Sequence, residues 1–463
     1  MNTYPKRWQA LNFLIIGAFL SPLDYFIVNM ALPSMKKAFS ASDHELQMVI
    51  AIYGLTYAAL VVCGGRLGDI YGRKKVFVWG LYTFLGSSLA CAFSPDITWL
   101  IASRMFQGIG ASLLAPQVLA SIKDLFNSQE QPKAISLFSS VFGLASVIGQ
   151  LLGGALLSIN WGQFSWEIIF LVNVPITAVC ILGIHFTMDN STNKKEQTDI
   201  DFIGALLLIL ALLMLICPLI FGQKFEWAWW IFGILFSGIM LLILFIKYER
   251  KKLEKNHPVL IDPDLLQQKP FALSLLIIFF YNFTAGLFIC YPYYLQQFLH
   301  QSSMQTGLAI VPYGLAFFLA PLVSSRIKMS PAKMINAGLG LLITGFTASA
   351  IAFYLHQKPS FIIHTTLFIA GLGHGTIMPV MMRTAISLVS RDKSGQASGL
   401  VSIGIQIGSV TGGAIIGTLF FNLIKVTGFT EAFAIAVGMI GVFQLTGVWA
   451  GNRLRKIIEQ NAD

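Results

Sequence analysis

The chain has 463 residues, of which 56% are hydrophobic and only 11% are charged. About a quarter of the residues of a soluble domain carry charge, so this composition excludes an ordinary water-soluble fold. The formal net charge of +10 could indicate nucleic-acid binding, but the basic residues gather in short segments between apolar stretches, which indicates orientation in a membrane and contact with anionic lipid.

Apolar stretches of roughly 18–28 residues recur along the whole chain, each long enough to cross a bilayer as a helix. The fourteen stretches lie near 8–33, 45–65, 76–94, 98–122, 134–158, 167–187, 202–222, 227–247, 270–298, 304–326, 332–355, 360–388, 396–424 and 429–451. An even number places both termini on one side, and Lys6, Arg7, Arg453, Arg455 and Lys456 predict that this side is cytoplasmic. On this topology 25 of the 31 Lys and Arg residues lie inside and 5 outside, and the last, Arg104, falls within a span. We expect a multi-pass protein of the plasma membrane (the bacterial inner membrane).

The first span contains an acidic residue, Asp24, within the run LDYFIVNMALP at 23–33. A carboxylate inside a span costs a few kcal/mol on insertion scales, so it needs a partner or a purpose. The alternative is a structural Asp near the membrane interface, held by hydrogen bonds.

A short basic segment, GGRLGDIYGRKKVF at 64–77, connects the second and third spans. Any cytoplasmic loop can be basic. A general excess of Lys and Arg does not explain Asp69 three residues before Gly72, or the run of cations that follows Gly72. Its glycines are expected to allow a tight turn and a close approach of neighbouring backbones. The segment resembles the loop signature of the major facilitator superfamily between its second and third helices. This resemblance implies a gating loop made by Gly65, Asp69, Gly72, Arg73 and Lys74.

The fourth span contains a cation, Arg104, in the run RMFQGIGA at 104–111. Arginine keeps its charge, so in a low-dielectric site it pairs with an acid. We predict a polar node of Arg104, Gln107 and Asp24 that faces the cavity of the N-terminal half; the alternative is a permanent ion pair that fixes helix packing. Arg-x-x-Gln-Gly resembles the superfamily's fourth-helix motif. Asp followed by Val-Asn-x-Ala-Leu-Pro resembles the first-span signature of the fourteen-span drug/proton antiporter branch, which implies that Asp24 is the proton-coupling carboxylate.

The fifth span has a face of small residues, in the run ASVIGQLLGG at 145–154. Small residues let two helices pack closely, and Gly149, Gly153 and Gly154 are expected to seal one side of the cavity. The run resembles the antiporter motif of the branch, which ends in Gly-Pro-x-x-Gly-Gly. Here Gln150 replaces the proline, which removes a kink and supplies a polar side chain. Close packing without any bearing on transport direction is the alternative.

Most of the superfamily has twelve spans in two six-helix halves, so fourteen spans imply an inserted pair. Residues 202–247 suit a peripheral, lipid-facing pair because they are almost purely aliphatic and aromatic. We expect an N-terminal six-helix bundle at 1–190, an inserted two-helix segment with linkers at 191–255, and a C-terminal six-helix bundle at 256–463. The halves should be related by an axis along the membrane normal.

The spans of the C-terminal half contain no carboxylate between 270 and 424, which argues for neutral, weakly charged or lipophilic substrates. The polar residues expected to line the substrate cavity are Asn29, Gln150, Tyr281, Asn282 and Gln406. His374 could titrate near neutral pH, but a histidine among glycines is more often a packed, hydrogen-bonded helix residue. The five cysteines form no CxxC pair and no Cys/His cluster, so the sequence indicates neither a metal site nor a disulfide framework.

The thirteenth span opens with GQASG at 395–399. In the superfamily the loop Asp contacts the start of this helix across the two halves. By that resemblance Asp69 favours the helix N-terminus electrostatically, and Arg73 braces the same loop. Such contacts would hold the cytoplasmic side closed and favour the outward-facing state.

These features together predict an all-α membrane protein with the major facilitator fold that exports small, lipophilic or weakly charged compounds in exchange for protons. Its partners would be protons, a small-molecule substrate and the lipid bilayer, with no nucleic acid, cofactor or metal, and it would function as a monomer. The alternatives are a proton-coupled importer or a carrier for one metabolite or siderophore. An intramembrane enzyme is disfavoured because the sequence has no HExxH, no paired aspartates on facing spans and no Ser/His pair. A passive receptor would leave Asp24 and Arg104 without a purpose.

Overall fold

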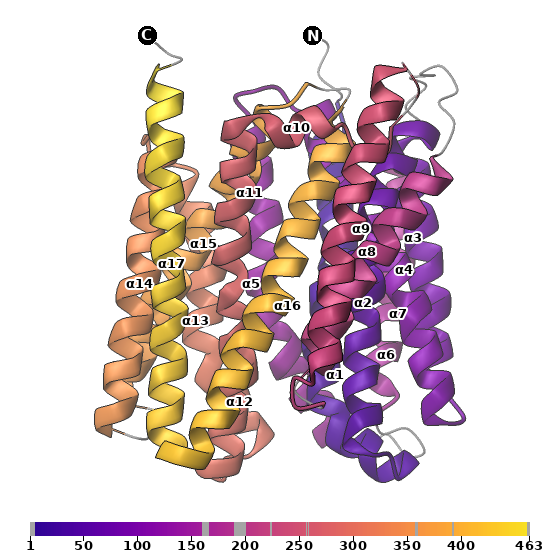
Figure 1. The fold of residues 1–463 in the computed structure, drawn as a ribbon. Coiled ribbons are helices and arrows are strands. Elements are labelled where there is room, and N and C mark those ends of the chain that lie inside the picture. Colours follow the sequence, from indigo (N-terminus) through magenta and orange to yellow (C-terminus); the bar gives the residue numbers. More distant parts are fainter. Residues whose placement is uncertain are drawn as a thin grey trace.

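The computed structural model describes residues 5–159, 166–188, 201–222, 225–255, 257, 259–356, 360–390 and 393–460. Within these ranges the chain is helical almost throughout, and fourteen helical segments are long and apolar enough to cross a membrane. The helices run side by side as one bundle, and both termini lie at the same end (Figure 1). The predicted all-α membrane fold with fourteen spans is therefore confirmed.

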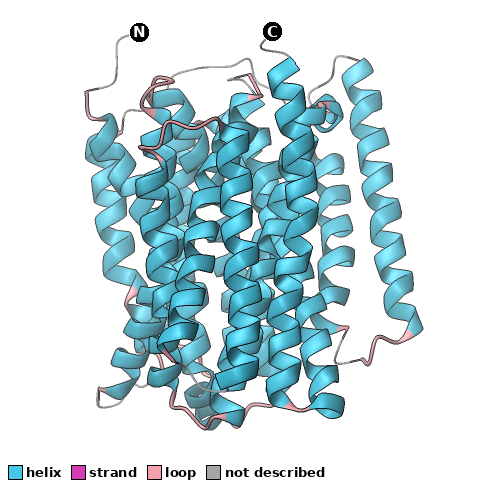
Figure 2. Cartoon of the chain, turned by 90° about the vertical axis from the view of Figure 1, so that its left-hand side faces the viewer, coloured by secondary structure: helices cyan, strands magenta, loops and turns pink. Residues whose placement is uncertain are grey.

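The first six spans are made by α1 to α7: Arg7–Phe39, Asp43–Tyr71, Arg73–Ala92, Ile97–Leu125, Gln131–Ser158, Ile168–Leu171 and Asn173–Thr187. The helices that follow are α8 Phe202–Phe221, α9 Trp229–Glu254, α10 Pro263–Gln267, α11 Lys269–Tyr281, α12 Leu287–Tyr293, α13 Ser303–Ser324, α14 Pro331–His356, α15 Phe361–Ser387, α16 Ser394–Thr427 and α17 Phe429–Gln460. Short loops join the helices at both ends of the bundle (Figure 2).

The predicted loop at 64–77 is wrong in its local structure, because all but one of its residues are helical. Helix α2 continues to Tyr71 and α3 begins at Arg73. The break is confined to Gly72, whose φ of 93° is a conformation that only glycine adopts readily. Gly65 lies inside α2, where a Cβ would stand 2.7 Å from the carbonyl oxygen of Gly395. Glycine at position 65 therefore allows close helix packing, not a turn.

The packing of α2, α3 and α4 is repeated by α13, α14 and α15. Helices α2 and α3 both pack on α4, and α13 and α14 both pack on α15. A Cβ on Gly108 of α4 would meet the Tyr53 carbonyl of α2, and one on Gly371 of α15 would meet the equivalent Tyr313 carbonyl of α13. Such repeated close contacts are what the internal symmetry expected from the sequence requires.

Helices α8 and α9 pack against each other outside the other twelve spans. Helix α8 lies on both α2 and α16, so the pair covers a seam between the first and second groups of spans (Figure 1). Large apolar side chains point outward from the pair, among them Phe202 (75% exposed) and Trp229 (85% exposed). This exposure is suited to contact with lipid.

Candidate functional site

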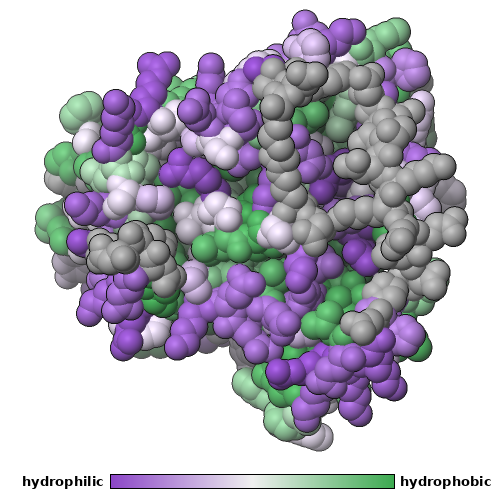
Figure 3. Space-filling model, turned by 90° about the horizontal axis from the view of Figure 1, so that it is seen from above, coloured by the Kyte–Doolittle hydropathy of each residue, from purple (hydrophilic) through white to green (hydrophobic). Residues whose placement is uncertain are grey.

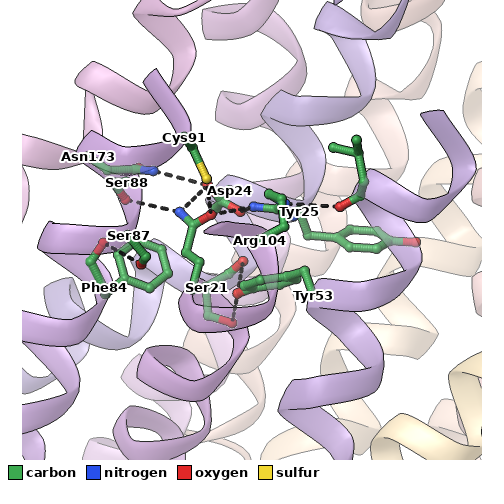
Figure 4. Close-up of polar contacts among 12 residues, drawn as sticks. Ser21, Asp24, Tyr25, Tyr53, Phe84, Ser87, Ser88, Cys91, Arg104 and Asn173 are labelled. Carbon is green, nitrogen blue, oxygen red and sulfur yellow. Dashed lines mark hydrogen bonds and ion pairs between the residues drawn. The ribbon is translucent and has the colours of Figure 1, made fainter. Parts of the chain in front are cut away.

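A fully buried ion pair lies inside the first group of spans. Asp24 of α1 and Arg104 of α4 are both 0% exposed, and the Arg104 guanidinium donates to the Asp24 carboxylate. The two side chains meet in a region crossed by several helices (Figure 4). The structure thus brings together the two charged residues that the sequence analysis singled out within spans.

Two amide side chains complete the surroundings of the Asp24 carboxylate. Gln107 donates from Nε2 to Oδ1 at 2.9 Å, and Asn173 of α7 donates from Nδ2 to the same oxygen at 3.0 Å. Gln107 also donates to Ser88 Oγ at 3.0 Å, and its own oxygen accepts from Arg104 at 2.6 Å. Every hydrogen bond that these side chains make to Asp24 is therefore one that the carboxylate accepts. We call Asp24, Arg104, Gln107 and Asn173 the buried node.

Arg104 is held by groups other than Asp24 as well. Its Nε donates to the carbonyl of Val49 on α2 at 3.0 Å. The guanidinium carbon lies 4.3 Å from the centroid of the Tyr53 ring, within the range of a cation–π interaction. The Tyr53 hydroxyl is hydrogen-bonded to Ser21 Oγ at 2.7 Å. Because α2 fixes the guanidinium, Arg104 has anchors that do not depend on the charge of Asp24.

The prediction that the node faces a cavity is wrong for this conformation, because neither Asp24 nor Arg104 has any exposed surface. The neighbouring residue on α1, Tyr25, is 39% exposed. Successive residues of an α-helix point ~100° apart, so α1 buries Asp24 while presenting Tyr25 on an adjacent face. Asn29, one turn further on, is exposed and donates to the Tyr25 carbonyl at 2.6 Å. Of the five expected cavity residues, Asn29 is the exposed one.

The contact that was expected between Asp69 and the start of α16 is present in the structure. The Asp69 carboxylate lies so close to Gly395 that a methyl group there would overlap it. Arg73 bridges Asp69 at 3.1 Å and Asp124, at the end of α4, at 2.5 Å. We call Gly65, Asp69 and Gly395 the α2–α16 contact. It joins the two groups of spans at the end that carries the termini.

Lys74 does not join this contact. Its ammonium donates to the carbonyls of His185 and Met188, so it caps the C-terminal end of α7 within the first group of spans. A lysine that the sequence analysis did not single out makes a second bridge at this end. Lys123 of α4 is buried and donates to carbonyls at the end of α15, including that of Ile386 at 2.9 Å. The sequence does not indicate this bridge, because the partners of Lys123 are backbone carbonyls, which every residue has.

The small-residue face of α5 packs mainly on α1. A Cβ at Gly149 would stand 2.6 Å from the Cβ of Phe26, and one at Gly153 would meet Ile27 at 3.1 Å. Gly154 has more room, because the nearest atom to a Cβ there, from Met304 of α13, would be at an ordinary 3.6 Å. The close seam with α13 is made instead by Gly143, which lies against the backbone of α13.

The remaining cavity candidates do not converge on one place. Tyr281 is 3% exposed and its hydroxyl donates to the His374 carbonyl at 3.0 Å, so its predicted position in the cavity is wrong. Asn282 is 8% exposed and donates to the Ile278 carbonyl at 2.7 Å. Gln150 and Gln406 lie at two different seams. Gln150 is beside Gly307 of α13, and Gln406 donates to the carbonyl of Gly54 at 3.4 Å.

His374 is a packed core residue, the interpretation that the sequence favoured. It is 7% exposed and its Nδ1 is hydrogen-bonded to the Tyr313 hydroxyl. The ring stacks on Phe317 with centroids 4.2 Å apart and meets Tyr281 edge-on at 4.4 Å. Aromatic side chains therefore surround the histidine.

Comparison with protein families gives a match over almost the whole chain. The profile described as Major Facilitator Superfamily matches residues 14–246, 200–413 and 271–456. Two curated relatives are a probable actinorhodin transporter of Streptomyces coelicolor and the multidrug resistance protein Stp of Mycobacterium tuberculosis. Each is 28% identical to this chain over 91% of its length, which corresponds to 74% of the first relative and 78% of the second.

The fold is similar to that of a solved transporter of the same superfamily. The proton:xylose symporter XylE, bound to 6-bromo-6-deoxy-D-glucose, superposes with a TM-score of 0.69, covering 97% of this chain and 95% of the symporter. The two sequences are 14% identical. Arrangement of the helices is thus preserved where sequence similarity is low.

Proposed function

Because the chain belongs to the Major Facilitator Superfamily, we propose that it is a proton-coupled exporter of small, lipophilic or weakly charged compounds. It is a transporter and not an enzyme. Curated relatives at about 28% identity are named as drug efflux or multidrug resistance proteins, which supports export. The observation that carries the proton coupling is the buried node, since a carboxylate sealed with an arginine inside a span is a costly arrangement.

Proton binding at Asp24 would change the hydrogen bonding of the whole node. A protonated carboxyl group has an O–H donor that needs an acceptor, but Arg104, Gln107 and Asn173 all donate to this carboxylate. At least one of them has to turn away or rotate its amide when the proton arrives. Arg104 would also lose its counter-charge, and an unpaired buried charge costs about 3–5 kcal/mol. Protonation therefore favours a conformation in which water or substrate reaches the node.

The helices that hold the node also carry the contacts between the two groups of spans. Helix α2 supplies Val49 and Tyr53 to Arg104, and Asp69 to the α2–α16 contact. Helix α4 supplies Arg104 and, near its end, Lys123. A change at the node can thus shift the helices that close the end carrying the termini. This link gives alternating access a physical route, with two conformations whose populations depend on the proton and the substrate.

We also propose that the end carrying the termini is cytoplasmic and that the protein works as a monomer. The excess of basic residues expected on that side supports the orientation. The close packing of α2 on α16 and of α5 on α13 supports a rocking motion of bundles 1–190 and 256–463 about a shared seam. Helices α8 and α9, from the predicted inserted segment 191–255, would cover that seam from the lipid.

The test is Asp24→Asn in everted membrane vesicles loaded with a pH-sensitive dye. Asparagine keeps the shape but cannot take up and release a proton, so substrate-dependent proton movement should fall at least about tenfold while substrate binding persists. Asp96→Asn is the matched control. Asp96 accepts from the Trp99 N–H at 2.8 Å as the N-cap of α4, and asparagine caps equally well. Undiminished proton-coupled transport by the Asp24 variant would refute the proposal.

A dedicated exporter of a single compound is the second candidate, favoured by the relative named as a probable actinorhodin transporter. Growth of cells that express the protein, tested against dyes, quaternary ammonium compounds and antibiotics, separates the two. Broad resistance supports the multidrug exporter. Resistance to one chemical class supports the dedicated one.

A further inference from the structure

A polar pocket opens between the two groups of spans, away from the buried node. It has a volume of about 90 Å³, and its lining includes Ser136 of α5, Ser324 of α13 and Arg383 of α15. Ser325 and Lys328, which follow the end of α13, also line the pocket. A water molecule needs about 15 Å³ measured in this way. The pocket therefore has room for a group larger than one or two waters.

Arg383 is the charged group that this pocket leaves without an acceptor. Its side chain is partly buried and makes no hydrogen bond or ion pair in the part of the chain that the structure describes. A guanidinium keeps its charge and presents five donors in a planar fork. Partial burial removes some of the water that would otherwise accept hydrogen bonds from this group, which is unfavourable. An anion that enters the pocket would supply the missing acceptors.

The corresponding region of the first group of spans is neutralised from within. There Arg73 lies between the carboxylates of Asp69 and Asp124. Helices α13, α14 and α15 repeat the packing of α2, α3 and α4, yet the pocket at their end is lined by Lys328 and Arg383 and by no acidic residue. The second group of spans therefore presents cations at this end without the carboxylates that neutralise Arg73 in the first group.

Hydroxyl groups and location indicate which anion fits. Ser136 is 4% exposed and makes no hydrogen bond among the described residues. Ser324 and Ser325 donate to carbonyls in their own helix and can turn toward a ligand. Arginine with serine hydroxyls is a suitable donor set for phosphate oxygens. Hydrophilic residues cover much of the end that carries the termini (Figure 3), which is the surface character expected beside lipid headgroups.

We propose that this pocket binds a phosphate group, supplied either by the headgroup of an anionic phospholipid or by free phosphate. Ser136 belongs to α5, whereas Arg383 belongs to α15, so a bound phosphate bridges the two groups of spans. A ligand that contacts both groups favours the conformation in which they are together. Occupancy of the pocket would therefore stabilise closure of this end. The inference does not depend on the transported compound or on proton coupling.

The experiment is native mass spectrometry of the full chain, released from detergent, with phosphatidylglycerol or phosphatidylcholine added. We expect preferential retention of phosphatidylglycerol and at least about tenfold weaker retention by Arg383→Gln, because charge-assisted hydrogen bonds are lost. Lys328→Gln, an exposed site that should not disturb folding, should weaken retention less. Arg326→Gln is the matched control. It removes an exposed cation that lies two positions before Lys328 and does not line the pocket.

A second arm adds inorganic phosphate at millimolar concentration. Displacement of phosphatidylglycerol, with protection of the wild type against thermal unfolding, identifies a site for free phosphate. Lack of displacement identifies a site for the lipid headgroup. Either result supports phosphate binding in the pocket, provided that Arg383→Gln abolishes the binding and Arg326→Gln does not. Equal retention of both lipids by the wild type, or equal behaviour of the two arginine variants, would overturn the proposal.

Discussion

Replacing Gly395 by alanine should open the end of the protein that carries the termini. The added methyl group would overlap the Asp69 carboxylate, which lies against Gly395 on the other side of the seam. Gly65 leaves no free space beside it, since its own Cβ position is 2.7 Å from the Gly395 carbonyl oxygen. The two helices must therefore separate, or Asp69 must leave its position near Arg73.

The size of the effect follows from the cost of adding a methyl group to a packed contact, about 1–3 kcal/mol. The cost applies only to the closed conformation, because the two helices are apart when this end is open. The ratio of open to closed molecules should then rise about 5- to 150-fold. Gly417→Ala is a matched control on the same helix α16, where the nearest atom to a new Cβ, from Ile289, is at an ordinary 3.7 Å.

The populations can be measured by electron–electron double resonance between spin labels at Ser128, after α4, and Ser387, at the end of α15. Both side chains are exposed. The five native cysteines would first be replaced. Gly395→Ala should increase the fraction of molecules with longer distances between the two spin labels, while Gly417→Ala should give the same distance distribution as the wild type. A distance distribution that stays unchanged in Gly395→Ala would show that the α2–α16 contact does not control closure.

Two further variants test the node and the ion pair between Arg7, at the start of α1, and Glu130, just before α5. Arg104→Lys keeps the positive charge but loses the hydrogen bond from Nε to the Val49 carbonyl and the planar guanidinium. Transport in vesicles should therefore fall by about tenfold or more, with the protein still folded. Normal transport would mean that a point charge at this position is sufficient. The hydrogen bond from Arg7 lowers the pKa of Glu130 below its usual 4.5, so the stabilisation by this pair is present above pH 4.5 and is lost as the pH falls below it. Glu130→Gln should remove that part of the acid-dependent decrease in melting temperature, and an unchanged pH profile would contradict the assignment.

The sequence was sufficient to predict the spans and the charged pair, for the same physical reason. Both follow from the cost of placing polar groups in hydrocarbon. That cost makes each apolar stretch a helix, and it forces Asp24 and Arg104 to find each other. Gln107 could be added because it lies one helical turn from Arg104, on the same face.

Uncharged partners could not be predicted in this way. Asn173, Tyr53 and Ser88 are uncharged, so placing them in a span costs less than placing a charge there, and that cost does not say which residue each of them contacts. Which of them meets Asp24 or Arg104 depends on how α2, α3 and α7 pack around α1 and α4. The same limit applies to Tyr281, whose hydroxyl reaches a backbone carbonyl in a neighbouring helix and is buried there.

The two groups of spans differ in the chemistry that they place beside equivalent tyrosines. In the first group Tyr53 lies under the guanidinium of Arg104, which is paired with Asp24. In the second group Tyr313 is bonded to His374, which aromatic rings surround. A proton can change the net charge of the first site without any carboxylate in the second having to respond. On the proposed mechanism the first group therefore carries the proton-dependent change, and the second contributes an uncharged, packed core around Tyr313 and His374. This division fits the proposed preference for lipophilic or weakly charged compounds, since the spans of the second group between 270 and 424 contain no carboxylate that could pair with a strongly cationic substrate.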